Sequence, residues 1–115
     1  HLEDADLRSA NLRGADLRGA RLARARLNGA DLRDAQLGPL LIAADRLMPA
    51  DLTGACLRGA DLSGADLKRA NLTGADLSRT TLRGACLKDA VMTGALTHAA
   101  RGLELASSPA VPEPA

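Results

Sequence analysis

Apolar residues recur at every fifth position along most of the chain, and we call this position the centre of each unit. Alanine stands two residues before most centres, Thr80 being the one polar substitute outside residues 38–49, and Asp or Asn usually lies between the alanine and the centre. The repeating unit is therefore A-(D/N)-L-x-x. Leucine occupies the centre at positions 2, 7, 12, 17, 22, 27, 32, 37, 47, 52, 57, 62, 67, 72, 77, 82 and 87, with Ile42 and Met92 in the same slot.

A helix does not fit this period. A five-residue step on an α-helix advances about 140° past a full turn, so the leucines would spread over every face. Nine of the eleven glycines also fall two residues after a centre, where each would cost about 1 kcal/mol inside a helix. The repeat therefore excludes a long helix.

An extended segment explains the unit. Side chains alternate along a strand, so the alanine and the leucine point to the same side while the intervening Asp or Asn points outward. The last two residues then turn the chain, a role that suits glycine, and Asp or Asn can hydrogen-bond nearby backbone. Successive coils would stack about 4.8 Å apart with leucine inside.

The segments ADLRSANLRGADLRGA and ADLTGACLRGADLSGADLKRANLTGADLS resemble the pentapeptide-repeat family, over roughly residues 2–97. The resemblance implies a right-handed quadrilateral β-helix, with four units to a coil. We therefore expect an all-β solenoid, a right-handed parallel β-helix of about four to five coils with a short C-terminal helix cap. The expected divisions are a β-helix over 1–97, a capping helix over 98–106 and a disordered tail over 107–115.

Composition narrows the candidate chemistry. The chain contains no aromatic residue, which fits a narrow interior and removes the stacking platform of single-stranded nucleic-acid binders. Its formal net charge is +1, with Asp mostly before the centre and Arg or Lys mostly after it. These neighbouring rows of opposite charge indicate a solvated, mutually compensating surface.

No catalytic or metal-binding group of residues stands out, so we expect a non-catalytic protein without a cofactor. Cys56 and Cys86 are six units apart, which would place them on opposite walls, beyond the 7 Å Cα limit of a disulfide. We therefore predict free thiols. His1 and His98 stand alone near the two ends, and metal binding needs more ligands than the chain groups together.

The repeat breaks between residues 38 and 49, where the spacing of centres persists but the unit does not. Leu40 would replace a packed alanine, and Asp45 would place a carboxylate inside at high cost. We favour a looped-out insertion of ten residues, with a helical turn from about Leu40 to Leu47; the alternative is a distorted coil. The simpler interpretation is that its apolar residues fold down onto a wall as local packing; the alternative is a partner-binding projection. The candidate residues are Leu40, Leu41, Ile42, Arg46, Leu47 and Met48.

A second break follows Met92. Leu96, Ala99, Ala100 and Leu103 recur at helical spacing and predict a short helix that covers the last coil, since open ends of a solenoid need covering. If this helix packs against a copy of itself, the same residues form a dimer interface at the end of the coil. The start of the chain in register, without Met, suggests a fragment of a longer repeat.

Two functions follow as hypotheses. The first is a protein-interaction or scaffold module with an unidentified protein partner. The second comes from the resemblance, because some pentapeptide-repeat proteins, including those of quinolone resistance, act on DNA gyrase and topoisomerase IV as DNA mimics; the balanced charge here departs from that acidic pattern. Direct nucleic-acid binding is disfavoured by the interleaved Asp residues. Without a signal peptide or an apolar span, a cytoplasmic protein is expected and no membrane partner.

Overall fold

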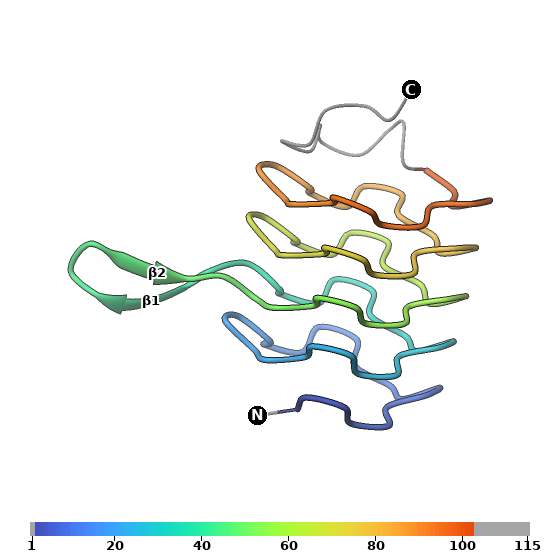
Figure 1. Cartoon of the computed structure of the whole chain (residues 1–115), viewed down its shortest axis with the longest axis horizontal. Coiled ribbons are helices and arrows are strands. Elements are labelled where there is room, and N and C mark those ends of the chain that lie inside the picture. The colour runs from blue at the N-terminus through green and yellow to red at the C-terminus, as the bar shows by residue number, and fades with distance from the viewer. Residues whose placement is uncertain (1, 103–115) are drawn as a thin grey trace.

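The backbone forms a column of stacked four-sided coils, from which one β-hairpin projects (Figure 1). The computed structural model describes residues 2–102. Its two strands are β1 (Leu40–Ala43) and β2 (Arg46–Met48), and they belong to the hairpin. The column itself is joined by isolated parallel bridges, because each wall is only about three residues long.

Each coil has four walls, which we number in chain order. Every wall holds the alanine, the outward residue and the centre of one unit, and two corner residues follow it. The first wall comprises 5–7, 25–27, 55–57, 75–77 and 95–97; the second 10–12, 30–32, 60–62, 80–82 and 100–102; the third 15–17, 35–37, 65–67 and 85–87; the fourth 20–22, 50–52, 70–72 and 90–92.

The register of the bridges locates the insertion. Asp6 pairs with Arg26, and Cys56 pairs with Asp76, both twenty residues apart. Arg26, however, pairs with Cys56, thirty residues further on. Ten residues are therefore excluded from the coil, in agreement with the looped-out interpretation, and the pairing of the walls resumes unchanged after Pro49.

Backbone hydrogen bonds between coils follow one rule on every wall. On the first wall, the N–H of Leu27 donates to the carbonyl of Cys56 at 2.7 Å, and the N–H of Cys56 donates to the carbonyl of Ala25 at 3.0 Å. The corner adds a third bond, from Gly29 N–H to the Arg58 carbonyl at 3.0 Å. The outward residue of an inner coil thus makes both of its backbone bonds to the preceding coil, while the alanine carbonyl and the leucine N–H of the same wall bond to the following coil.

The core is a stack of leucine and alanine side chains inside the walls. Twelve leucines from Leu22 to Leu87 are fully buried, and the alanines beside them are buried as well. Thr80 replaces one of these alanines, and its hydroxyl donates to the Leu77 carbonyl at 2.8 Å. This local bond removes the cost of burying an unsatisfied hydroxyl.

Asp and Asn precede the centre because their side chains close the next corner. The Asp51 carboxylate accepts the N–H of Thr53 at 3.0 Å, and Asn71 accepts that of Thr73 at 3.1 Å. These Asx turns satisfy a backbone donor that the coil-to-coil ladder leaves free. The second corner residue is left-handed, at φ +70° in Gly64 and φ +59° in Arg69, which explains why glycine is frequent there.

The helix predicted over 98–106 does not form in its described part. Residues 98–102 continue the coil, since Leu96 bridges to Asp76 and Arg101 bridges to Thr81. The physical reason is that Ala95 and Ala100 keep the five-residue period, so that inter-coil hydrogen bonds extend the column. Residues 103–106 of that helix, and the tail predicted over 107–115, lie outside the described residues.

Truncating a leucine in the middle of the column should lower stability more than truncating a leucine in the first coil. Leu72 is 0% exposed, and Leu72→Ala should lower the free energy of unfolding by about 2–5 kcal/mol through lost burial and a cavity. Leu12 in the first coil is only partly buried, so Leu12→Ala should cost clearly less. Urea denaturation of both variants measures the difference, and equal losses would contradict this account of the core.

Candidate functional site

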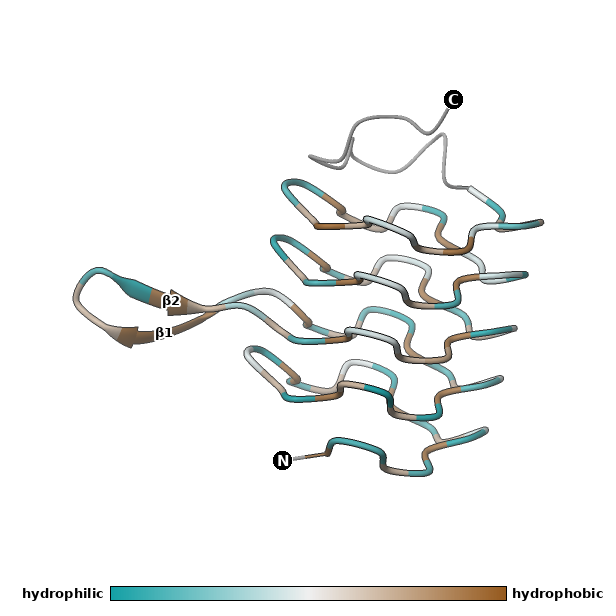
Figure 2. Cartoon of the chain, viewed as in Figure 1, coloured by the Kyte–Doolittle hydropathy of each residue, from teal (hydrophilic) through white to brown (hydrophobic). Residues whose placement is uncertain are grey.

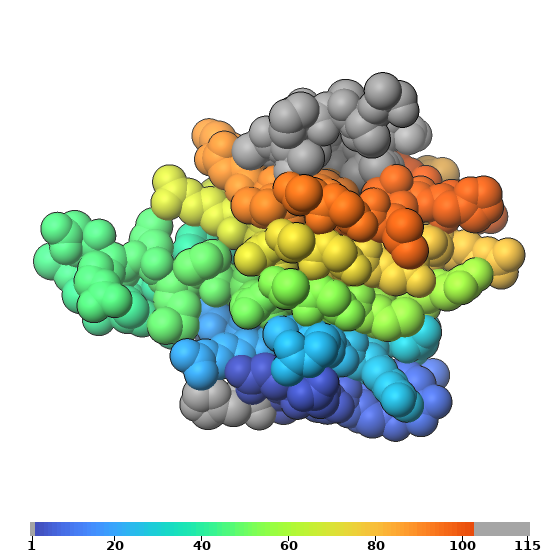
Figure 3. Space-filling model, in the orientation of Figure 1, coloured from blue at the N-terminus to red at the C-terminus, as the bar shows by residue number. Residues whose placement is uncertain are grey.

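The hairpin leaves the column at the corner between the third and fourth walls. β1 begins two residues after Gly38, β2 ends just before Pro49, and Ala44 and Asp45 form the turn between them. The space-filling view shows that this element stands out from the column while the other corners stay close to it (Figure 3). It is therefore the feature most accessible to another macromolecule among residues 2–102.

The base of the hairpin rests on the coil below it. A Cβ on Gly19 would lie 2.8 Å from the Cβ of Leu40 and 3.2 Å from the carbonyl oxygen of Met48. Leu40 pairs with Met48 across the two strands, so this first pair occupies space that only a glycine at position 19 leaves open. The column thus fixes the direction in which the hairpin projects.

The outer part of the hairpin presents apolar side chains to solvent. Leu41 pairs with Leu47, and the two side chains are 62% and 45% exposed. Ile42 lies at an irregularity between Leu41 and Ala43 and is also exposed, while Arg46 pairs with Ala43 next to the turn. Figure 2 shows this hydrophobic character along β1. These residues do not fold down onto a wall.

A β-hairpin forms where the sequence predicted a helical turn. The ten inserted residues must leave and re-enter the column at the same corner, and two antiparallel strands bring both ends to one point. A single helical turn would carry the chain away from its return point. Leu40, Leu41, Ile42, Arg46, Leu47 and Met48 are nevertheless brought together in one element.

The second predicted surface, which was to serve as a cap or dimer interface, is not assembled by the described residues. Leu96 points outward from the first wall, Ala99 is an exposed corner residue at φ +57°, and Ala100 packs against the core. The five-residue period overrides the helical spacing and sends the three side chains in different directions. Leu103 lies outside the described residues.

Ion pairs are concentrated in the lower coils. Asp6, Asp16 and Asp31 each accept two guanidinium hydrogen bonds from the arginine two residues later, at 2.6–2.9 Å. The side-chain hydrogen bond to Arg8 lowers the pKa of Asp6 to about 2, and Arg18 and Arg33 lower the pKa of Asp16 and of Asp31 to about 2 in the same way. Arg8, Arg18 and Arg33 are therefore each compensated by a carboxylate of their own unit.

The upper part of the second wall and the two corners beside it differ from this pattern. Asp61 accepts the Ser63 hydroxyl at 2.7 Å and lies 4.0 Å from Arg33 of the coil below, and Asp76 of the first wall accepts the N–H of the corner residue Ser78 at 2.9 Å. Four arginines in this region have no ion pair with any carboxylate of residues 2–102: Arg58, Arg79, Arg83 and Arg101.

We call the second wall and its two corners, which carry these four arginines, the basic side. The corner that it shares with the first wall lies diagonally across the column from the hairpin. The prediction of a uniformly compensated surface is therefore too coarse. It rests on the order of the charges along the chain and does not consider which charges share a wall. Sorting the arginines by wall would have revealed the basic side, since positions 58, 79, 83 and 101 fall on one wall and its two corners.

The cysteines lie as predicted. Cys56 is on the first wall and Cys86 on the third, both as free thiols, and the amide of Asn28 donates to the Cys56 sulfur at 3.0 Å.

Within the described range, no group of three or more His, Cys, Asp or Glu could hold a metal ion. No helix in the same range is long and apolar enough to cross a membrane.

The architecture is that of a right-handed parallel β-helix with four-sided coils. The chain belongs to the pentapeptide-repeat family: the pattern described as pentapeptide repeats matches eight copies, over residues 1–37, 47–84 and 55–94. The gap between the first two ranges covers most of the hairpin. None of the curated proteins matches the chain.

Solved pentapeptide-repeat structures resemble this one. A protein of the Arabidopsis thaliana thylakoid lumen is 33% identical with a TM-score of 0.70, over 82% of this chain and 59% of that one. The plasmid-mediated fluoroquinolone resistance protein QnrB1 is 25% identical with a TM-score of 0.52, over 82% of this chain and 46% of that one. HetL, involved in heterocyst differentiation regulation in Nostoc sp. strain PCC 7120, is 39% identical with a TM-score of 0.42, over 91% and 39%. The chain therefore spans less than two thirds of the length of these neighbours.

The Asp31–Arg33 pair gives a test of the surface electrostatics. In Arg33→Gln the pKa of Asp31 should rise from about 2 towards its ordinary value, because the guanidinium bonds that favour the carboxylate are lost. Carboxyl NMR titration measures this, with Asp6 as the internal control. Since folding lowers this pKa, the stability that Asp31 contributes should be lost as pH falls from about 4 to about 2. An unchanged Asp31 pKa in the variant would contradict the assignment.

Proposed function

We propose that this chain is a non-catalytic protein-interaction module, whose partner docks on the outer part of the hairpin. The observation that carries the proposal is the exposed Leu41–Leu47 pair on an element held by a rigid column. Loops on rigid scaffolds commonly carry function, and an isolated two-stranded hairpin with apolar side chains in water is marginally stable on its own. A protein partner would bury that surface.

Two further observations support an interaction role over catalysis. The histidine and the two cysteines of residues 2–102 are not grouped with one another, and the carboxylates bond corner residues or arginines. The neighbour QnrB1 is described as a plasmid-mediated fluoroquinolone resistance protein. The cytoplasmic location expected from the sequence stays a prediction.

Charging the hairpin should abolish partner capture. The double variant Leu41→Asp, Leu47→Asp places two carboxylates where the partner would bury leucine, and binding should weaken at least about a hundredfold. Affinity capture from a lysate of the source organism identifies the partner, and titration with the purified partner measures the loss. Leu96→Asp is the matched control, because Leu96 is 57% exposed on the first wall. Equal binding by both variants would rule out the hairpin as the docking element.

Modulation of DNA gyrase or topoisomerase IV is a second candidate, favoured by the likeness to QnrB1 and by the projecting hairpin. The charge distribution argues against mimicry of DNA along the whole column, because a mimic needs a continuous acidic surface and the second wall and its two corners carry arginines without an ion pair. An action on a topoisomerase would therefore depend on the hairpin.

A supercoiling assay tests this second candidate. The chain should change the rate at which gyrase supercoils relaxed plasmid, or restore supercoiling in the presence of a quinolone, and the Leu41→Asp, Leu47→Asp variant should lose the effect while Leu96→Asp keeps it. No effect of the unaltered chain at micromolar concentration would exclude gyrase, and the same assay with decatenation would exclude topoisomerase IV.

A further inference from the structure

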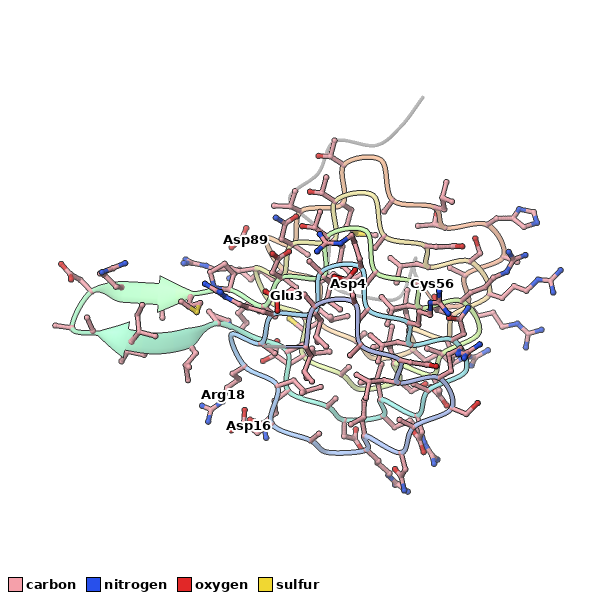
Figure 4. All side chains as sticks on the ribbon, turned by 60° about the horizontal axis from the view of Figure 1, so that its bottom comes forward. Glu3, Asp4, Asp16, Arg18, Cys56 and Asp89 are labelled. Atoms are coloured by element: carbon pink, nitrogen blue, oxygen red, sulfur yellow. The ribbon has the colours of Figure 1, made fainter. Side chains whose placement is uncertain are left out.

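The unit over residues 80–84 keeps an arginine after its centre but lacks the carboxylate that pairs with such an arginine elsewhere. Where Asp holds the outward position and arginine follows two residues later, the two side chains are joined, as Asp16 and Arg18 are at 2.8 Å (Figure 4). Thr81 holds the outward position in this unit and offers a hydroxyl instead of a carboxylate. Arg83 is therefore exposed and has no ion pair with a carboxylate of residues 2–102.

Two more arginines lie around Thr81. Arg101 forms the parallel bridge with Thr81, and therefore stands directly above it on the second wall. Arg79 comes two residues before Thr81, at the corner shared with the first wall, and Arg83 lies at the corner shared with the third. Arg79 and Arg101 are exposed, and neither forms an ion pair within the described range. Thr81 is thus surrounded by three arginines that no carboxylate of residues 2–102 neutralises.

Arg79, Thr81, Ala99 and Arg101 line a hollow of about 280 Å³ on the outside of the second wall. The small side chain of Ala99 leaves this space open. Pockets for drug-sized ligands usually measure about 300–1,000 Å³, so this hollow suits one small charged group. It lies on the outward face of two stacked coils, and therefore does not involve either end of the column.

These side chains match the chemistry of a phosphate monoester. Such a group carries about 1.5 to 2 negative charges at neutral pH and three acceptor oxygens. Guanidinium groups donate paired N–H bonds to phosphate oxygens in a planar fork, and the Thr81 hydroxyl can donate one more. A carboxylate has a single charge and two oxygens, so it would leave part of this donor set unused.

The carboxylates below Thr81 restrict the ligand to a compact group. Asp61 bridges to Thr81 from the coil below, and Asp31 bridges to Asp61 in turn. An extended polyanion lying along the second wall would meet both of these carboxylates. The chain also has no aromatic side chain on which nucleic-acid bases could stack. The arrangement therefore favours a single phosphate over a nucleic-acid strand.

We propose that Thr81, together with Arg79, Arg83 and Arg101, forms a binding site for one phosphate monoester group. Phosphorylated side chains of proteins and small phosphorylated compounds both carry this group. The site lies on the basic side and contains no residue of the hairpin. It is therefore a second binding surface, which does not rest on the function proposed for the hairpin.

Arginine side-chain NMR tests the site in the unaltered chain. At neutral pH and constant ionic strength, replacing chloride with inorganic phosphate should give saturable shifts of the Nε–Hε resonances of Arg79, Arg83 and Arg101. Arg18, whose guanidinium is held by Asp16 at 2.8 Å, should not shift and serves as the internal control. A peptide with one phosphothreonine should bind at least about tenfold tighter than inorganic phosphate if the group is recognised on a protein, and no tighter if the ligand is a small phosphorylated compound.

Restoring the regular unit should abolish the site. Thr81→Asp places a carboxylate where it pairs with Arg83 and repels phosphate, so phosphate binding should weaken more than about tenfold. Asn71→Asp is the matched control, because it makes the same change of charge at the outward position of the fourth wall, and it should bind phosphate like the unaltered chain. Both variants introduce a residue that the repeat prefers at this position. The Leu82 amide, which donates to the Arg101 carbonyl at 2.7 Å, should therefore stay protected from exchange in each.

The proposal fails if the three arginine resonances do not shift when phosphate replaces chloride. It also fails if Thr81→Asp binds phosphate as well as the unaltered chain while the Leu82 amide is still protected, or if Asn71→Asp loses binding to the same extent. Binding of duplex DNA without any response to inorganic phosphate or to the phosphopeptide would reveal a surface for polyanions instead, and would contradict a compact site.

Discussion

The structure depends on a ladder of backbone hydrogen bonds between coils that only a five-residue unit can maintain. Two inward side chains, alanine and leucine, fit a narrow column, and two corner residues turn the chain with the second in the left-handed conformation. The ladder then fixes every outward residue above its counterpart in the next coil. Packing, charge placement and the position of the hairpin all follow from that register.

This constraint explains why the insertion is tolerated. A ladder between coils can accept extra residues only at a corner, where the two ends of the inserted segment stay close together. The antiparallel strands β1 and β2 meet that requirement, and the small Gly19 leaves room for their base. The column is unchanged by the insertion, while the hairpin acquires an apolar surface that no wall offers.

The sequence predicts the inside of the column better than its surface. The period places leucine and alanine inside, Asp and Asn at the outward wall position before the centre, and the cysteines on opposite walls, because each of these follows from position within the repeat. The sequence predicts a helical turn where the hairpin forms, because the ten inserted residues do not follow the five-residue unit. The helix expected near Leu96 rested on a chance 3.6-residue spacing, against which the inter-coil bonds of residues 95–101 prevail. The basic side around Arg79 and Arg101 emerges only when residues twenty apart are placed together.

Methyl contacts between leucines test the central claim, the register of the ladder, most directly. Nuclear Overhauser effects should join the methyl groups of Leu52 to those of Leu72, twenty residues on, and the methyl groups of Leu22 to those of Leu52, thirty residues on. Contacts from Leu22 to the methyl groups of Ile42 would instead show a coil that runs through residues 38–49, and would contradict the account.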